Sequence, residues 1–137
     1  MPLIHITLAG PSAAPRTIQY LQQETTRLMQ TILHKEAALT VVSVTQLPEA
    51  AFSANGQAVV GGASMQALIT AGTNSAREKA DFIFAANKLL TATGSCSAAP
   101  TYVALHELPA ESWGYDGETQ AARKAQREPA NAAGGAA

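Results

Sequence analysis

Apolar residues recur at helical spacing in two long segments of the chain, and shorter segments around them have the composition of β-strands. The first helical pattern covers about residues 14–33, and the second begins at Ser75. The strand-like segments are rich in apolar and β-branched residues and cover residues 3–8, 39–47 and 102–108, and Leu68-Ile69-Thr70 aligns with Ile6-Thr7-Leu8 of the first strand. The pattern predicts the order strand, helix, strand in each half of the chain.

Residues at the ends of the predicted helices act as start and stop signals. Pro15 fits the first turn of a helix, where a backbone N–H group has no partner within the helix. Ser75 followed by Glu78 has the spacing of a capping box, and Gly94 is expected to end the second helix.

The two halves resemble each other at an offset of 61 to 62 residues, which indicates an internal duplication of residues 2–60 as residues 62–118. The best match aligns Gln46-Leu47-Pro48, Phe52, Asn55 and Gly56 with Glu107-Leu108-Pro109, Trp113, Asp116 and Gly117. Order, spacing and residue class agree together. By the same offset, Ser64 takes the place of Pro2 in the second half.

These elements predict an α/β (α+β) fold built from a duplicated β-α-β unit. A strand-helix-strand unit of this length joins parallel strands by a right-handed crossover, so two units give a four-stranded sheet with two helices on one face. We expect no further helix to cover the other face, whose residues we expect to be apolar, so self-association is the economical way to bury it. Residues 1–120 are predicted to form one domain, followed by an Ala/Gly-rich tail at 121–137 that is mobile or a fraying helix.

Composition and charge exclude several classes of function. The chain has 137 residues and a net charge of -1, so no electrostatic footprint for nucleic acid or an anionic membrane surface is present. No stretch is apolar enough to span a bilayer, and no secretory signal is recognised, so we expect a cytoplasmic protein. Cys96 is the one cysteine, which precludes an intrachain disulfide; it has no neighbour that would make it a nucleophile. His5, His34 and His106 lack metal-ligand spacing, so we expect no metal and no cofactor.

Pro2 is the strongest candidate for chemistry. Removal of Met1 would leave a secondary amine at the start of the apolar strand 3–8. An unperturbed α-amino group titrates near ~7.7 to 8.0, and burial or a nearby cation lowers this pKa further. The neutral amine would then be available as a base at physiological pH.

Taken together, these features resemble the tautomerase superfamily, whose simplest member is 4-oxalocrotonate tautomerase. The resemblance covers roughly residues 2–118. It rests on Pro2, on Gly10 after the first strand, and on the Pro, aromatic and Gly that follow the second strand in each half. It is closest to members with two fused units: cis-3-chloroacrylic acid dehalogenase, malonate semialdehyde decarboxylase and macrophage migration inhibitory factor. The resemblance implies a homotrimer that encloses a central barrel, with a small-molecule substrate beside Pro2 as the catalytic base.

The chain departs from the family at the positions of its substrate-binding arginines. Pro11 follows Gly10, and Thr73 follows Gly72, the equivalent glycine of the second half, where the family places an arginine. Val41 and Tyr102 begin the second strand of each half, where the family places another arginine. The arginines and the acid that the dehalogenases and decarboxylases use are also absent, near Thr70, Thr73 and Tyr115. Hydrolytic chemistry and a doubly charged substrate are therefore disfavoured. A less acidic enol, such as a phenylpyruvate-like compound, or an unsaturated ketone suits this chain better.

Four further residues are candidates for substrate binding, and each has a structural alternative. Trp113 is a pocket wall or a packed loop aromatic, and Tyr102 is a hydrogen-bond donor or an exposed strand residue. Tyr115 has the same two readings as Tyr102. Lys35 lies near where one branch of the superfamily carries a pocket lysine, or it is a solvated lysine at a helix end.

The sequence is therefore compatible with two functions. The first is an isomerase that interconverts keto and enol tautomers with Pro2 as base, at low turnover. The second is a non-catalytic trimeric binding protein that keeps the fold without the cationic site.

Overall fold

The computed structural model describes residues 2–93 and 99–136, so the predictions for Met1, Gly94 and Cys96 lie outside the described residues. The elements are, in order, β1 (Leu3–Ala9), α1 (Pro15–Thr31), η1 (Ala37–Leu39), β2 (Val41–Leu47), η2 (Glu49–Ala51), β3 (Ser53–Ala54), β4 (Gln57–Ala58), β5 (Gly62–Thr70), α2 (Ala76–Thr93), β6 (Tyr102–Leu108), β7 (Gly114–Tyr115), β8 (Glu118–Thr119) and α3 (Gln120–Ala136).

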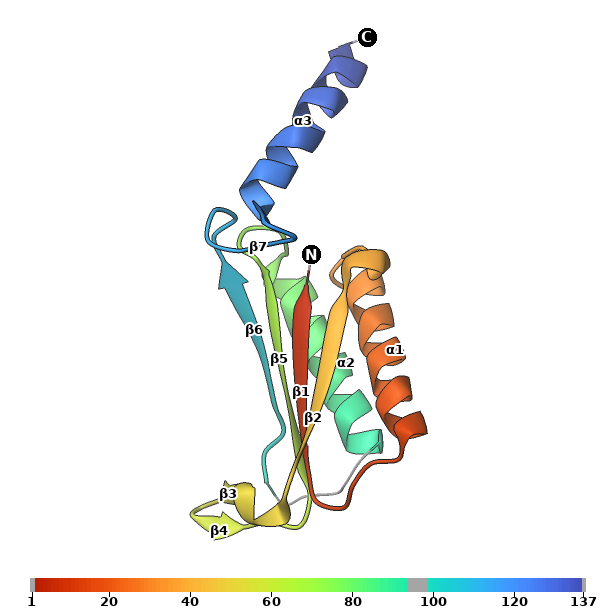
Figure 1. The fold of residues 1–137 in the computed structure, drawn as a ribbon, viewed down its shortest axis with the longest axis vertical. Helices are drawn as coiled ribbons and strands as arrows, with labels where there is room; N and C mark the ends of the chain where they lie inside the picture. Colours follow the sequence, from red (N-terminus) through yellow and green to blue (C-terminus); the bar gives the residue numbers. More distant parts are fainter. Residues whose placement is uncertain (1, 94–98, 137) are drawn as a thin grey trace.

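One four-stranded sheet with the order β2-β1-β5-β6 forms the centre of the fold, and α1 and α2 cover one of its faces (Figure 1). β1 runs parallel to β2, β5 runs parallel to β6, and the two pairs meet antiparallel along β1 and β5. Leu3 pairs with Val41 and Ser64 pairs with Tyr102, so the register offset is 38 residues in both halves. The predicted fold class, a duplicated β-α-β unit, is confirmed.

The predicted capping signals form in the structure. Pro15 is the first residue of α1. The Ser75 backbone N–H donates to Glu78 Oε1 at 2.9 Å, and the Glu78 N–H donates to Ser75 Oγ at 3.1 Å. This reciprocal pair is the capping box that the sequence predicts for α2.

The core lies between the sheet and the two helices. Alternate residues of β1, Ile4 and Ile6, point into it and are fully buried. Its other large members are Leu21, Met29, Leu33, Met65, Phe82 and Leu90.

Each half of the chain ends in a small hairpin whose turn demands special backbone angles. Asn55 and Gly56 join β3 to β4, and Asp116 and Gly117 join β7 to β8. All four residues have positive φ values, between 51° and 86°. Asn-Gly and Asp-Gly are the pairs that best tolerate a primed two-residue turn, which explains why the sequence repeats them at the same place.

The face of the sheet away from α1 and α2 is more polar than predicted. The strand register sets its residues in four rows: Val41, Leu3, Leu68 and His106; Ser43, His5, Gln66 and Ala104; Thr45, Thr7, Ser64 and Tyr102; and Leu47, Ala9 and Gly62. His5 Nδ1 and Ser43 Oγ form a hydrogen bond of 2.7 Å on this face. The two middle rows are largely polar, so the expectation of an apolar open face was wrong for two of the four rows.

Residues 120–136 form a third helix, α3, in the segment predicted to be a mobile tail or a fraying helix. This helix projects away from the end of the sheet and leaves the open face uncovered (Figure 1). Its start is fixed by backbone hydrogen bonds from Gln120 to Trp113 and from Ala121 to Ala110, both 2.9 Å. Mobility of the segment 121–137 stays a prediction. Among the described helices, none combines the length and apolar character that a membrane crossing requires.

Candidate functional site

Pro2 lies buried at the start of β1, between the two strands that flank it. The Pro2 carbonyl accepts a hydrogen bond of 3.2 Å from the Val41 N–H group. Leu3 pairs with Val41 and Leu68, so continuation of the register sets Thr40 and Ile69 beside Pro2. Pro2 is thus buried directly before β1, and its role as a catalytic base stays a prediction.

A cavity of about 240 Å³ opens at the same end of the sheet, and we refer to it as the Lys35 cavity. Four basic side chains line it: His34, Lys35, Lys124 and Arg127. One acidic residue, Glu36, lines it as well, with Thr70, Thr73, Ala110 and Gln120. The wall therefore combines the loop after α1, the end of β5 and the first turns of α3.

Lys35 is held in the cavity wall by hydrogen bonds at both ends. Its backbone N–H donates to the Met29 carbonyl at 3.0 Å, and Nζ donates to Thr73 Oγ1 at 2.8 Å. Burial lowers the pKa of Lys35, and the carboxylates of Glu78 and Glu107 oppose this shift only in part. Lys35 is thus partly buried and hydrogen-bonded, and its role as a pocket lysine stays a prediction.

Glu78 links the same loop to the start of α2. It accepts hydrogen bonds from Ser75 N–H and Asn74 Nδ2, and His34 Nε2 lies 3.1 Å from its Oε2. The Ser75 N–H, followed by Asn74, lowers the pKa of this carboxyl group. Glu78 therefore forms an ion pair with His34, while the Lys35 side chain donates its hydrogen bond to Thr73.

Trp113 lies next to the cavity without lining it. Its Nε1–H donates to Thr70 Oγ1 at 3.1 Å, which ties the loop before β7 to the end of β5. It is partly buried and lines a separate surface cavity of about 340 Å³ together with Tyr115. The choice between pocket wall and packed aromatic stays open.

Tyr115 is covered by a cation from α3. The Arg123 guanidinium lies 3.8 Å from the centre of the Tyr115 ring, and Arg123 Nη2 donates to the Tyr115 carbonyl at 3.1 Å. Both residues line a cavity of about 300 Å³, whose wall shares Glu36 and Arg127 with the Lys35 cavity. The structure therefore brings Tyr115 and Lys35 to neighbouring cavities.

Tyr102 lies at the other end of the sheet within one chain. It pairs with Ser64, which pairs with Thr7, five residues along β1 from Pro2. Its side chain is exposed, with 73% of its surface accessible. The chain alone does not bring Tyr102 and Pro2 together.

Sequence reasoning missed the basic residues of α3. Lys124 and Arg127 are three positions apart, which sets them on one face of a helix, and Arg123 precedes them. This spacing was the signal available, but the surrounding Ala and Gly residues favoured a mobile tail. Among the described residues, no cluster of three His, Cys, Asp or Glu side chains offers a metal site.

No family model matches the sequence. No curated protein sequence matches it either. Solved structures share its fold: Pt0534 inactivated by 2-oxo-3-pentynoate has a TM-score of 0.79 at 17% identity, covering 88% of this chain and 98% of that one. A symmetric trimer of wild-type fused 4-OT has a TM-score of 0.77 at 18% identity, with the same coverage. A macrophage migration inhibitory factor-like protein of Entamoeba histolytica has a TM-score of 0.72 at 18% identity, covering 86% of this chain and 97% of that one. The resemblance to the tautomerase superfamily is thus confirmed at the level of the fold.

Proposed function

We propose that this chain is a keto–enol tautomerase that acts on a small enol or keto acid, with Pro2 as general base after removal of Met1. The observation that carries the proposal is the position of Pro2. It is buried at the start of β1, at the end of the sheet where the Lys35 cavity opens, in a fold shared with fused 4-OT and MIF-like structures.

The chemistry follows from a neutral secondary amine in this position. Pro2 N takes a proton from the enol oxygen or the α-carbon of the substrate and returns it to the other site, so no net proton is consumed. Negative charge develops on the substrate oxygen during the transfer. Hydrogen-bond donors or cations aimed at this oxygen lower the barrier.

The proposed assembly is a homotrimer, with cytoplasmic location favoured by the single cysteine. Fused 4-OT forms trimers, and its fold matches this chain over 98% of its own length. In such an assembly Tyr102 of a neighbouring subunit is the proposed donor for Pro2, since each chain holds these two residues at opposite ends of its sheet. Trp113 and Tyr115 are proposed to shape the substrate site.

The experiment compares wild type with Pro2→Ala on phenylenolpyruvate. We expect ketonisation to slow at least ~10-fold in Pro2→Ala, because a positioned base contributes at least this much. Tyr102→Phe should slow it less. Pro15→Ala is the matched control, since Pro15 begins α1 at the far end of the sheet (Figure 1); it should leave the rate unchanged.

Mass spectrometry provides the second part of the test. The intact protein should lack Met1, and 2-oxo-3-pentynoate, which inactivates Pt0534, should add one molecule at Pro2 and abolish activity. A retained Met1, or equal rates for wild type and Pro2→Ala on every enol tested, would refute the proposal.

The alternative is a non-catalytic trimeric binding protein. The specific observation in its favour is that Pro11 and Thr73 replace the arginines that the superfamily resemblance leads one to expect. Under this alternative the protein binds small acids with no turnover, and Pro2→Ala changes nothing.

A further inference from the structure

The two ends of the duplicated sheet differ in charge although they are equivalent in fold. The Lys35 cavity has a counterpart at the other end, which we refer to as the Leu8 cavity, of about 310 Å³. In the internal alignment, Leu8 and Pro11 of this counterpart correspond to Thr70 and Thr73 of the Lys35 cavity. Among the described residues, none of the side chains lining the Leu8 cavity is charged. Fold alone therefore does not account for the basic wall of the Lys35 cavity.

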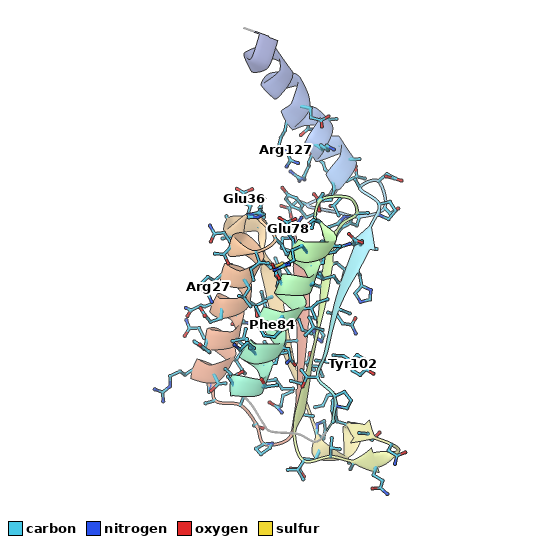
Figure 2. The ribbon with its side chains drawn as sticks, turned by 180° about the vertical axis from the view of Figure 1, so that it is seen from behind. Arg27, Glu36, Glu78, Phe84, Tyr102 and Arg127 are labelled. Carbon is cyan, nitrogen blue, oxygen red and sulfur yellow. The ribbon has the colours of Figure 1, made fainter. Side chains whose placement is uncertain are left out.

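The extra charge comes largely from α3, which the first half of the duplication does not have. Lys124 and Arg127 face the loop that carries Lys35, and Figure 2 shows Arg127 on α3 above Glu36. Because these cations belong to a helix outside the two repeats, they occur at one end of the sheet only.

Carboxylates near the cavity pair with His34 and weakly with Lys124, and form no ion pair with Lys35 or Arg127 among the described residues. Glu36 is the one acidic residue in the wall, and Glu78 is already engaged by Ser75, Asn74 and His34. Lys124 Nζ lies 3.6 Å from Glu128 in an exposed pair, a kind that contributes little. Lys35 and Arg127 have no carboxylate partner among the ion pairs of the described residues.

We infer that Lys35, Lys124 and Arg127 form an anion site that binds the carboxylate of a small organic acid. A wall with three cations and Thr hydroxyl groups suits a carboxylate, which accepts charge-assisted hydrogen bonds. A volume of about 240 Å³ is just below the usual range for small-molecule sites, which favours a small ligand. The desolvation that lowers the pKa of Lys35 would be offset by a bound anion.

This inference deepens the proposed function, on which it rests for the identity of the substrate. It replaces the expectation that the site has lost its cations. Positive charge that is missing at Thr73 is supplied at the same cavity by Lys35 and by Lys124 and Arg127 of α3, so the substrate class is a small monocarboxylic keto or enol acid rather than a neutral ketone.

Binding of benzoate, a non-reacting monocarboxylate, tests the inference without turnover. Affinity is measured by calorimetry, and NMR shift changes locate the site. The double variant Lys124→Gln/Arg127→Gln should bind benzoate at least ~10-fold more weakly, since hydrogen bonds to charged groups are each worth at least this factor. Arg16→Gln/Lys88→Gln removes the same charge from exposed residues of α1 and α2 and should bind as wild type does.

The arms of the experiment separate the two proposals. Benzoate binding that weakens as expected, and that persists in Pro2→Ala, supports the anion site even where Pro2→Ala leaves the reaction rate unchanged. Equal benzoate affinity in Lys124→Gln/Arg127→Gln and Arg16→Gln/Lys88→Gln would overturn the anion site. NMR shift changes away from Lys35 and Thr73 would overturn it as well. Neither result would affect the proposed role of Pro2. Benzamide binding as tightly as benzoate, or inorganic phosphate binding more tightly, would overturn the assignment to a carboxylate.

Discussion

Lys35 Nζ donates a hydrogen bond of 2.8 Å to Thr73 Oγ1, which connects the loop after α1 to the loop after β5. A second bond from Asn74 Nδ2 to the Leu33 carbonyl, 2.9 Å, joins the same two loops. The lysine is therefore positioned by the fold before any ligand arrives. A cation that is already oriented loses little side-chain freedom on binding, which favours affinity.

The capping box of α2 supports these loops, and its loss should lower stability. Ser75→Ala removes the acceptor for the Glu78 N–H group, and we expect the free energy of unfolding to fall by about 1 kcal/mol. Ser75→Thr keeps the acceptor and should retain most of the stability. Urea unfolding measures both, and equal midpoints for wild type and Ser75→Ala would contradict the role of the cap.

The fold was predictable because its signals are local. The spacing of Ser75 and Glu78, the position of Pro15 and the paired turns Asn55-Gly56 and Asp116-Gly117 each act within a few residues. Such signals can be read without knowing what packs where. The repeat then predicted two equal units in one four-stranded sheet, whereas the strand order and the antiparallel contact of β1 with β5 depend on how the two units pack.

The cations of the site were harder to predict because they come from distant parts of the chain. Lys35 and Thr73 are 38 residues apart, and α3 adds Lys124 and Arg127 from a segment with the composition of a tail. Helix propensity of Ala-rich sequence is high, but the direction in which α3 leaves the hairpin depends on tertiary contacts of Gln120 and Ala121. The polar open face was unexpected for a related reason, because the face on which each strand residue lies depends on the register between strands that are distant in the sequence.

Gly114 should be intolerant of any side chain. A Cβ atom at this position would collide with the Glu118 backbone carbonyl across the β7–β8 hairpin, which cannot move aside. We expect Gly114→Ala to lower the free energy of unfolding by roughly 2 kcal/mol, as in other overpacked sites. Gly72→Ala is the control: its Cβ would meet open space, so only the strain of a positive φ remains. Thermal unfolding should rank Gly114→Ala below Gly72→Ala, and the reverse order would show that the hairpin tolerates the added atom.

Thr25 offers a stabilising substitution. Its side chain is fully buried in the core face of α1, and its Oγ1 has no hydrogen-bond partner among the described residues. Thr25→Val removes this unpaired hydroxyl at nearly constant shape, so we expect the free energy of unfolding to rise by about 1 kcal/mol. Thr26→Val is the matched comparison, since Thr26 Oγ1 donates to the Gln22 carbonyl at 2.8 Å. The free energy of unfolding should not rise in this variant. A loss of stability in Thr25→Val, measured by urea unfolding, would show that the hydroxyl group is satisfied.

The proposed trimer predicts a mass in solution of about three times 14.2 kDa by light scattering. Val41 lies in the apolar row of the open face with 58% of its surface exposed, so Val41→Arg should weaken assembly by burying a charge. Phe84→Arg is the control, because Phe84 is 67% exposed on α2, on the opposite side of the sheet (Figure 2). A monomer at micromolar concentration, or equal effects of the two variants, would contradict this assembly.

The affinity for benzoate should fall at alkaline pH, because Lys35 loses its charge there. Burial lowers the pKa of this lysine below 10.5, so its charge is lost at a lower pH than that of an exposed lysine. Glu78 and Glu107 limit the shift, and Glu36, His34, Lys124 and Arg127 line the same cavity. A bound carboxylate favours protonated Lys35, so affinity is full below the pKa and declines as pH rises through it. In Lys35→Arg the guanidinium stays charged throughout this range, so its affinity should decline less between neutral pH and pH 10.5. Parallel pH profiles for wild type and Lys35→Arg would remove Lys35 from the anion site.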